Sequence, residues 1–165
     1  MVEQLLDLTG IGSSRLQLRW VSAAEGQLFA NYVTELSEVI GKLGPFQPDV
    51  FKLELSALES VLKSTRIRWL MGIDRQITEQ ENVYHEKMEA TAYQTFVRQA
   101  VADEYEKGLI LEALADGPQS VREMAKKTGL PVYTVSLRLN DLERGGQAQF
   151  HKFEGTAAKF ARLAA

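Results

Sequence analysis

Residues 15–45 have the sequence RLQLRWVSAAEGQLFANYVTELSEVIGKLGP, which predicts one strand followed by one helix. Over residues 15–21 apolar and polar side chains alternate, and this period of two is typical of a strand with one buried face. The apolar members of the alternation are Leu16, Leu18 and Trp20. No second strand is evident before residue 146, whereas a strand and helix of this kind normally lie in a larger sheet. The sequence therefore predicts that this unit needs a partner.

The helix is predicted over residues 23–43. Ser22 precedes Glu25 by three positions, which is the spacing of a capping box at a helix start. Apolar residues then recur every three or four positions as far as Leu43, and Gly44-Pro45 is a typical helix end.

The composition excludes several classes of site. The chain has 165 residues, of which 45% are apolar and 25% charged, as in ordinary soluble proteins. It contains no cysteine, which excludes disulfides, thiolate metal sites and iron-sulfur ligation by this chain. With no signal-like start, the sequence fits a cytoplasmic protein. No apolar run approaches the roughly 18 residues of a membrane span, and a net charge of −3 would not attract nucleic acid or an anionic membrane.

The middle of the chain predicts a long helix from Asp49 to about Leu70, a polar connector over residues 72–88 and a further helix over residues 90–102. A basic cluster lies near the end of the long helix and consists of Lys63, Arg66 and Arg68. These cations could bind an anion such as a cofactor phosphate, but the favoured interpretation is stabilisation of a helix C-terminus.

Residues 104–165 predict three helices followed by a hairpin. The first helix is closed by Asp116-Gly117-Pro118, and Ser120 with Glu123 forms a second capping box. The second helix ends at Gly129, and the third extends from the turn that follows Pro131 to Arg144. Two short extended runs then flank Glu154-Gly155. This order resembles the winged-helix superfamily and its helix-turn-helix.

The third helix offers two different surfaces. Its predicted core positions are Val132, Val135, Leu139 and Leu142. The opposite face presents Tyr133 and Leu137, which together with Trp20 are the candidate protein-interface residues. The alternative is contact with DNA phosphates through Arg138, Arg144 and Lys152. Residues 104–165 carry nine Lys/Arg and eight Asp/Glu, a poor electrostatic footprint for nucleic acid, so protein contact is favoured.

No catalytic constellation is evident. Glu81, His85 and Glu89 share helical spacing and could form a metal cluster, but a solvated connector is the favoured interpretation. Trp20 and Trp69 are expected to be core or interface anchors. Phe150 and Phe153 should face opposite sides of a regular strand.

The string at residues 15–45 resembles the C-terminal part of the delta subunit of methyl-viologen-reducing hydrogenase, the small iron-sulfur subunit associated with heterodisulfide reductases. The resemblance covers residues 1–45. It implies a cysteine-rich region before this segment, which holds a [2Fe-2S] cluster and passes electrons between a donor and a flavin-containing subunit. None of those cysteines is in this chain. We therefore expect no cofactor on this chain, with [2Fe-2S] and FAD on partner chains or on a missing upstream region.

Together these observations predict a mainly α protein of the α+β type with three parts. Residues 1–46 form the strand and helix, residues 47–103 a helical connector, and residues 104–165 a winged-helix module. The leading hypothesis is a non-catalytic adaptor of a cytoplasmic electron-transfer complex, which docks on iron-sulfur or flavoprotein subunits. The alternative is a DNA-binding transcription regulator that forms a homodimer through its helical middle.

Overall fold

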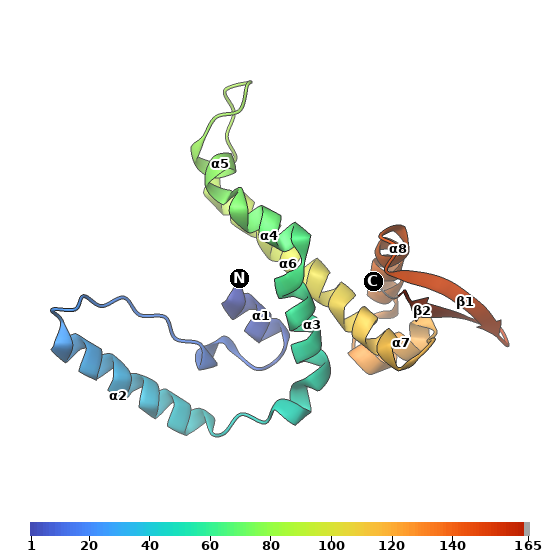
Figure 1. Cartoon of the computed structure of the whole chain (residues 1–165), viewed down its shortest axis with the longest axis horizontal. Coiled ribbons are helices and arrows are strands. Elements are labelled where there is room, and N and C mark those ends of the chain that lie inside the picture. The colour runs from blue at the N-terminus through green and yellow to red at the C-terminus, as the bar shows by residue number, and fades with distance from the viewer. Residues whose placement is uncertain (164–165) are drawn as a thin grey trace. The chain divides into compact units, whose positions relative to one another are not determined.

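The computed structural model describes residues 1–163 and is mostly helical, with one small two-stranded antiparallel sheet near the C-terminus (Figure 1). The chain divides into two compact units, Met1–Phe51 and the part that begins at Lys52. The predicted mainly α class with a minor β component is confirmed at this level.

The first unit contains two α-helices and two short 3-10 helices. These are α1 (Val2–Leu8), η1 (Ser13–Arg15), α2 (Gly26–Leu43) and η2 (Pro48–Phe51). The predicted helix is α2, which begins three residues later than expected. The Glu25 carboxylate does accept the Ser22 N–H at 2.7 Å, but the Ser22 hydroxyl accepts from Ala24, ahead of the first helical turn. Gly44 ends α2 with a φ of 69°, a conformation that favours glycine.

The predicted strand at residues 15–21 is wrong. The backbone is extended at Leu16, with φ −109° and ψ 119°, but no strand forms in the first unit. Within the described chain, the main-chain groups of residues 17–21 make no hydrogen bond with other main-chain groups. Since a strand is defined by its ladder, an extended segment without a neighbouring strand stays irregular.

The second unit begins with four helices, α3 (Lys52–Lys63), α4 (Thr65–Gly72), α5 (Asp74–Glu79) and α6 (Ala90–Ala113). The single long helix predicted from Asp49 to Leu70 is wrong because Ser64 interrupts it. The backbone of Ser64 is extended, and its hydroxyl accepts the Ile67 N–H at 3.4 Å, which caps a new helix. The predicted connector over residues 72–88 contains the short helix α5.

Helix α6 packs closely on α3. A Cβ atom on Gly108 would lie 2.9 Å from the main-chain oxygen of Ala57, so a side chain at this position would prevent the observed approach. α6 is continuous across residues 103 and 104, where a division between connector and C-terminal module was predicted.

The C-terminal elements follow the predicted order of helices and hairpin. They are η3 (Leu114–Asp116), α7 (Val121–Thr128), α8 (Val132–Arg144), β1 (Ala148–Glu154) and β2 (Ala157–Arg162). The Ser120–Glu123 capping box is confirmed in both directions, and Gly129 ends α7 in the left-handed conformation. Three of the four core positions predicted on α8 are buried, namely Val135, Leu139 and Leu142. Val132 is 51% exposed, because it is the first residue of the helix.

The hairpin contains an irregularity that changes which way its side chains point. Phe150 pairs with Phe160 and Lys152 with Lys159, so His151 is an extra residue without a partner. Beyond this bulge the alternation of faces shifts by one residue. The rings of Phe150 and Phe153 consequently lie 5.1 Å apart, on one side, and the prediction that they face opposite sides is wrong.

Candidate protein-interaction sites

In the first unit, the extended segment of residues 16–21 lies along α2 and is held there by cationic side chains. The Arg15 guanidinium donates to the carbonyl oxygens of Leu43 and Gly44, both at 3.1 Å, and so caps the C-terminus of α2. The Arg19 guanidinium lies 5.6 Å from the ring centre of Tyr32, in the middle of the helix. The segment therefore runs antiparallel to α2.

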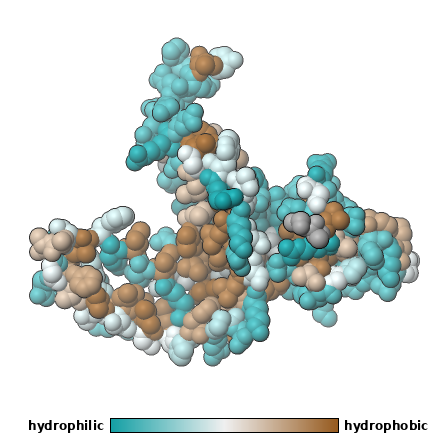
Figure 2. All heavy atoms as spheres, viewed as in Figure 1, coloured by the Kyte–Doolittle hydropathy of each residue, from teal (hydrophilic) through white to brown (hydrophobic). Residues whose placement is uncertain are grey.

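Between the segment and α2 lies an apolar groove of about 360 Å³. We call it the N-terminal groove, and its lining residues are Gln17, Leu18, Arg19, Val21, Phe29, Tyr32, Val33, Glu35, Leu36 and Val39. No residue of α2 is buried, and Phe29, Val33 and Ile40 are exposed. Figure 2 shows apolar side chains along this helix. An amphipathic helix that leaves its apolar face uncovered is suited to contact with another protein.

Trp20, a predicted interface residue, is 85% exposed and lies near the end of the extended segment that precedes α2. The two candidate residues on α8 are also accessible, since Tyr133 is 78% and Leu137 41% exposed. Trp20 belongs to the first unit, whereas Tyr133 and Leu137 both belong to the second.

Arg138, a candidate nucleic-acid contact, is occupied by carboxylates of its own chain. Its Nε atom donates to Glu106 at 2.7 Å, and its two terminal nitrogens contact Asp103 and Asp141. The side chain is only 14% exposed. The other two candidates, Arg144 and Lys152, are exposed.

The remaining charged clusters form ordinary ion pairs. Lys63 lies 2.6 Å from Glu59, and Arg66 lies 3.2 Å from Glu104. His85 contacts Glu81 at 3.2 Å in a non-helical turn, where its own φ is 61°. Among residues 1–163 no group of three or more His, Asp and Glu side chains is arranged to hold a metal ion.

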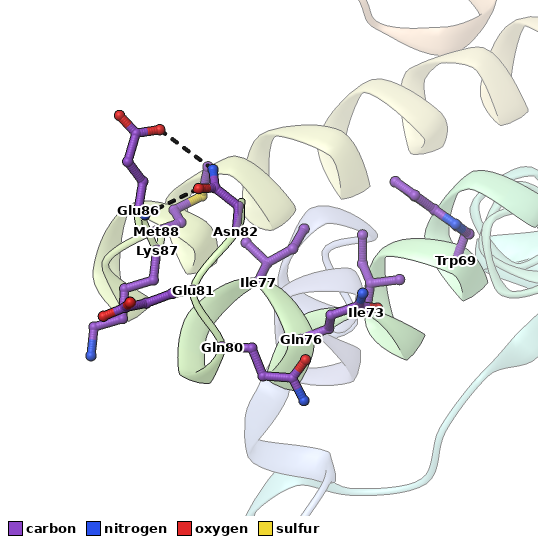
Figure 3. Close-up of a pocket in the computed structure, with 10 residues that line it drawn as sticks. All are labelled: Trp69, Ile73, Gln76, Ile77, Gln80, Glu81, Asn82, Glu86, Lys87 and Met88. Carbon is purple, nitrogen blue, oxygen red and sulfur yellow. Dashed lines mark hydrogen bonds between the residues drawn. The ribbon is translucent and has the colours of Figure 1, made fainter. Parts of the chain in front are cut away.

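A second groove, of about 760 Å³, lies mainly within the segment predicted to be a polar connector (Figure 3). Its lining comes from α4, α5 and the loop after them, and consists of Trp69, Ile73, Gln76, Ile77, Gln80, Glu81, Asn82, Glu86, Lys87 and Met88. The signal that would have found it is the spacing of 69, 73, 76 and 80, which places four residues on one helical face.

Taken together, these features define a helical protein whose exposed apolar grooves are suited to protein contact. Comparison with known proteins gives a family for one part of it. Residues 1–44 match the family described as methyl-viologen-reducing hydrogenase, delta subunit. An iron-sulfur subunit of the F420-non-reducing hydrogenase of Archaeoglobus profundus is 43% identical over 47 residues, which cover 28% of this chain and 34% of that protein. The resemblance inferred from residues 1–45 is thus confirmed. No solved structure matches the chain.

The family match ends at the residue that terminates α2. It therefore contains the extended segment, the whole of α2 and every residue of the N-terminal groove. The stretch that aligns with the Archaeoglobus profundus relative covers about a third of that protein's length. Iron-sulfur clusters are held by cysteine thiolates, and this chain has no cysteine, so its residues do not fit such a cluster. Within residues 1–163, no helix is long and apolar enough to cross a membrane.

Proposed function

We propose that this chain is a non-catalytic adaptor subunit, or a fragment of one, in a cytoplasmic electron-transfer complex of the hydrogenase or heterodisulfide-reductase type. The observation that carries the proposal is the coincidence of the family match with the N-terminal groove. Sequence similarity to a hydrogenase subunit is confined to the part of the chain that presents an uncovered apolar helix and an extended segment without a pairing strand.

The proposed mode of docking is strand addition. Residues 17–21 present main-chain groups that have no main-chain partner in the described structure, and a sheet edge on another subunit would supply one. The N-terminal groove would then accept apolar side chains from the same partner. Trp20, near the end of the segment, would be buried in that contact, as large aromatic residues are at the centres of interfaces.

The proposed partners are iron-sulfur or flavoprotein subunits that carry the [2Fe-2S] cluster and FAD of the complex. The iron-sulfur part of this assignment is supported by the name of the relative, an iron-sulfur subunit of a hydrogenase, and by the absence of cysteine in this chain. The flavoprotein part is what the family resemblance of residues 1–45 implies. The chain would hold such subunits together and take no part in electron transfer itself.

For the C-terminal part we propose a winged-helix module that contacts a second protein through α8. Helices α6, α7 and α8 followed by the β1–β2 hairpin are in the order of that superfamily, and Tyr133 and Leu137 are exposed on α8. The DNA-binding alternative is less well supported, because the Arg138 guanidinium, one of its three candidate contacts, is bound by three carboxylates.

The experiment is affinity capture with the tagged full-length chain in an extract of its source organism, followed by mass spectrometry and an absorbance spectrum of the captured material. We expect an iron-sulfur or flavin protein of the hydrogenase or heterodisulfide-reductase type. Trp20→Ala should reduce its recovery by about tenfold or more, as for an interface hot spot. Tyr84→Ala is the matched control, since Tyr84 is an exposed aromatic residue of the second unit that lines neither groove. Failure to capture any such protein, or equal losses with both variants, would refute the proposal.

A further inference from the structure

The inference concerns the outer face of α4 and α5, and it does not depend on the proposed function. Residues 69, 73, 76 and 80 follow one another at intervals of four, three and four, which is the spacing of a coiled-coil seam. Ile77 lies beside them on the same face. We call this set the arm stripe, and its members are Trp69, Ile73, Gln76, Ile77 and Gln80.

The stripe is continuous although two helices contribute to it. The Ile73 N–H donates to the Trp69 carbonyl oxygen at 3.1 Å, and the Ile77 N–H donates to the Ile73 carbonyl oxygen at 3.0 Å. The first bond closes α4 and the second opens α5, and the chain bends between them at Ile73, with φ −97° and ψ 2°. The stripe therefore passes from one short helix to the next across a bend. Figure 3 shows Trp69, Ile73 and Ile77 in succession along the two helices, with the loop that carries Met88 at the far end.

Within its own chain, α4 already has a partner on the opposite face. Ile67 and Leu70 are buried there, and the Tyr93 hydroxyl of α6 donates to the Leu70 carbonyl oxygen. The stripe itself stays accessible, because Trp69 is 60% exposed and the groove above it has a volume of about 760 Å³. A helix pair with a second apolar face is half of a four-helix arrangement.

The charges at the two ends of the stripe are of opposite sign. At the α4 end, Arg68 is exposed beside Trp69, and Arg66, one helical turn before Trp69, is exposed but already paired with Glu104 of α6. At the α5 end the exposed carboxylates are Asp74, Glu79, Glu81 and Glu86, of which Glu79 pairs with Arg75 and Glu81 contacts His85. Arg75 and Lys87 are the lysine and arginine residues of this end, so carboxylates outnumber them. Two stripes placed side by side in the same direction would bring like charges together. Placed in opposite directions, they would bring arginines against carboxylates.

We propose that two copies of this chain pair through their arm stripes in antiparallel orientation. Trp69 of each copy then lies against Gln80 of the other, and Ile73 lies against Gln76. The seam spans the 12 residues from 69 to 80, or roughly 17 Å of helix, so the dimer is weak and its population depends on concentration. The occupant of the groove is the same groove of a second copy.

The first test measures the molar mass of the 165-residue chain by sedimentation equilibrium, at protein concentrations up to about 200 µM. We expect a monomer–dimer equilibrium. Ile73→Glu should weaken the dimer by at least about tenfold, because it places a charge in the seam. Val132→Glu, at an exposed apolar position on α8, is the matched control and should have no effect. Far-UV circular dichroism reports whether the variants fold, and Gln76→Glu, at an exposed position, replaces Ile73→Glu if that variant does not.

The second test fixes the orientation and uses the absence of native cysteine. The single variants Trp69→Cys and Gln80→Cys are mixed and oxidised, and we expect a disulfide between the two different chains. Each variant alone should form few disulfides, since the antiparallel seam separates identical positions. Efficient self-crosslinking of Trp69→Cys would show a parallel pair and overturn the proposal. A chain that stays monomeric at every concentration, or a dimer unaffected by Ile73→Glu, would also overturn it.

Discussion

Glu123 illustrates how much one side chain contributes to the C-terminal elements. Its carboxylate accepts the Ser120 N–H at 2.7 Å and the Lys159 ammonium at 2.6 Å, and so connects the start of α7 to β2. The hydrogen bond from Lys159, followed by that from Ser120, lowers the pKa of Glu123 from 4.5 to about 2. The folded state therefore favours the ionised carboxylate.

This lowered pKa predicts a pH dependence. Because the folded pKa lies below the unfolded one, the contribution of Glu123 is complete above a pH of 4.5 and is lost as the pH falls towards about 2. The difference in melting temperature between the natural chain and Glu123→Gln should therefore be largest near neutral pH and shrink over that interval. Thermal unfolding at a series of pH values measures it, with the exposed Glu143→Gln as control. A difference independent of pH would contradict the argument.

Arg138 shows at the same scale what sequence alone leaves open. The sequence makes this arginine a candidate for contact with DNA phosphates, whereas in the structure its side chain is only 14% exposed. Its partners Asp103 and Glu106 lie more than thirty positions earlier, on α6. A helical pattern shows which face a residue occupies, but the neighbours across that face depend on how helices pack.

At the scale of elements, the packing of α6 on α3 rests on the absence of a side chain at Gly108. A methyl group there would meet the Ala57 main chain at 2.9 Å and 3.1 Å, so the helices would have to separate. Gly108→Ala should therefore lower the free energy of unfolding by about 1–3 kcal/mol, although alanine favours helix.

Gly41→Ala provides the matched comparison, because an added Cβ at this position of α2 would meet nothing within 4 Å. That variant should leave stability unchanged or raise it by up to about 1 kcal/mol through helix propensity. Urea unfolding of both variants measures the two changes. Equal effects would show that close approach is not what Gly108 provides.

The elements that were predicted correctly are those set by local chemistry. The capping box at Ser120 and the glycine at position 129 define α7 within ten residues of sequence, and tertiary contacts do not alter them. The strand at residues 15–21 failed because alternation describes side chains, whereas a strand also requires a neighbour. The bulge at His151 was not foreseen because it is a property of the pairing between β1 and β2.

The candidate sites show the same difference between features set by local sequence and features set by contacts between distant segments. The exposure of Trp20, Tyr133 and Leu137 agrees with their assignment as interface candidates, which stays a prediction. The groove along α4 and α5 was missed because the polar residues of the connector obscured the spacing that continues from Trp69 to Gln80. Its far wall is formed by a returning loop, where the Met88 N–H donates to the Ile77 carbonyl oxygen at 3.1 Å. Periodicity does not predict such a return.

At the scale of the whole molecule, the proposed contact with the redox partner and the proposed dimer contact belong to different units of the chain. They should therefore be separable by mutation. Trp20→Ala should reduce capture of the redox partner by about tenfold or more and leave the monomer–dimer equilibrium unchanged. Ile73→Glu should weaken the dimer and leave capture unchanged. Capture and sedimentation measurements on both variants and on the double variant test this independence. If either variant impaired both contacts, a single shared surface would be the better explanation.

The two attachments of the extended segment have a further consequence. At one end the Arg15 guanidinium is bound to the last carbonyl oxygens of α2, and at the other the Ser22 N–H is bound to Glu25. Residues 16–21 between them are restrained to an extended course before any other molecule arrives. A free peptide would lose conformational entropy on binding, but in this chain much of that entropy is lost before binding. The free-energy cost avoided on binding is roughly 1 kcal/mol for each residue held. Removing Arg15 would therefore slow and weaken association even though its side chain touches no partner.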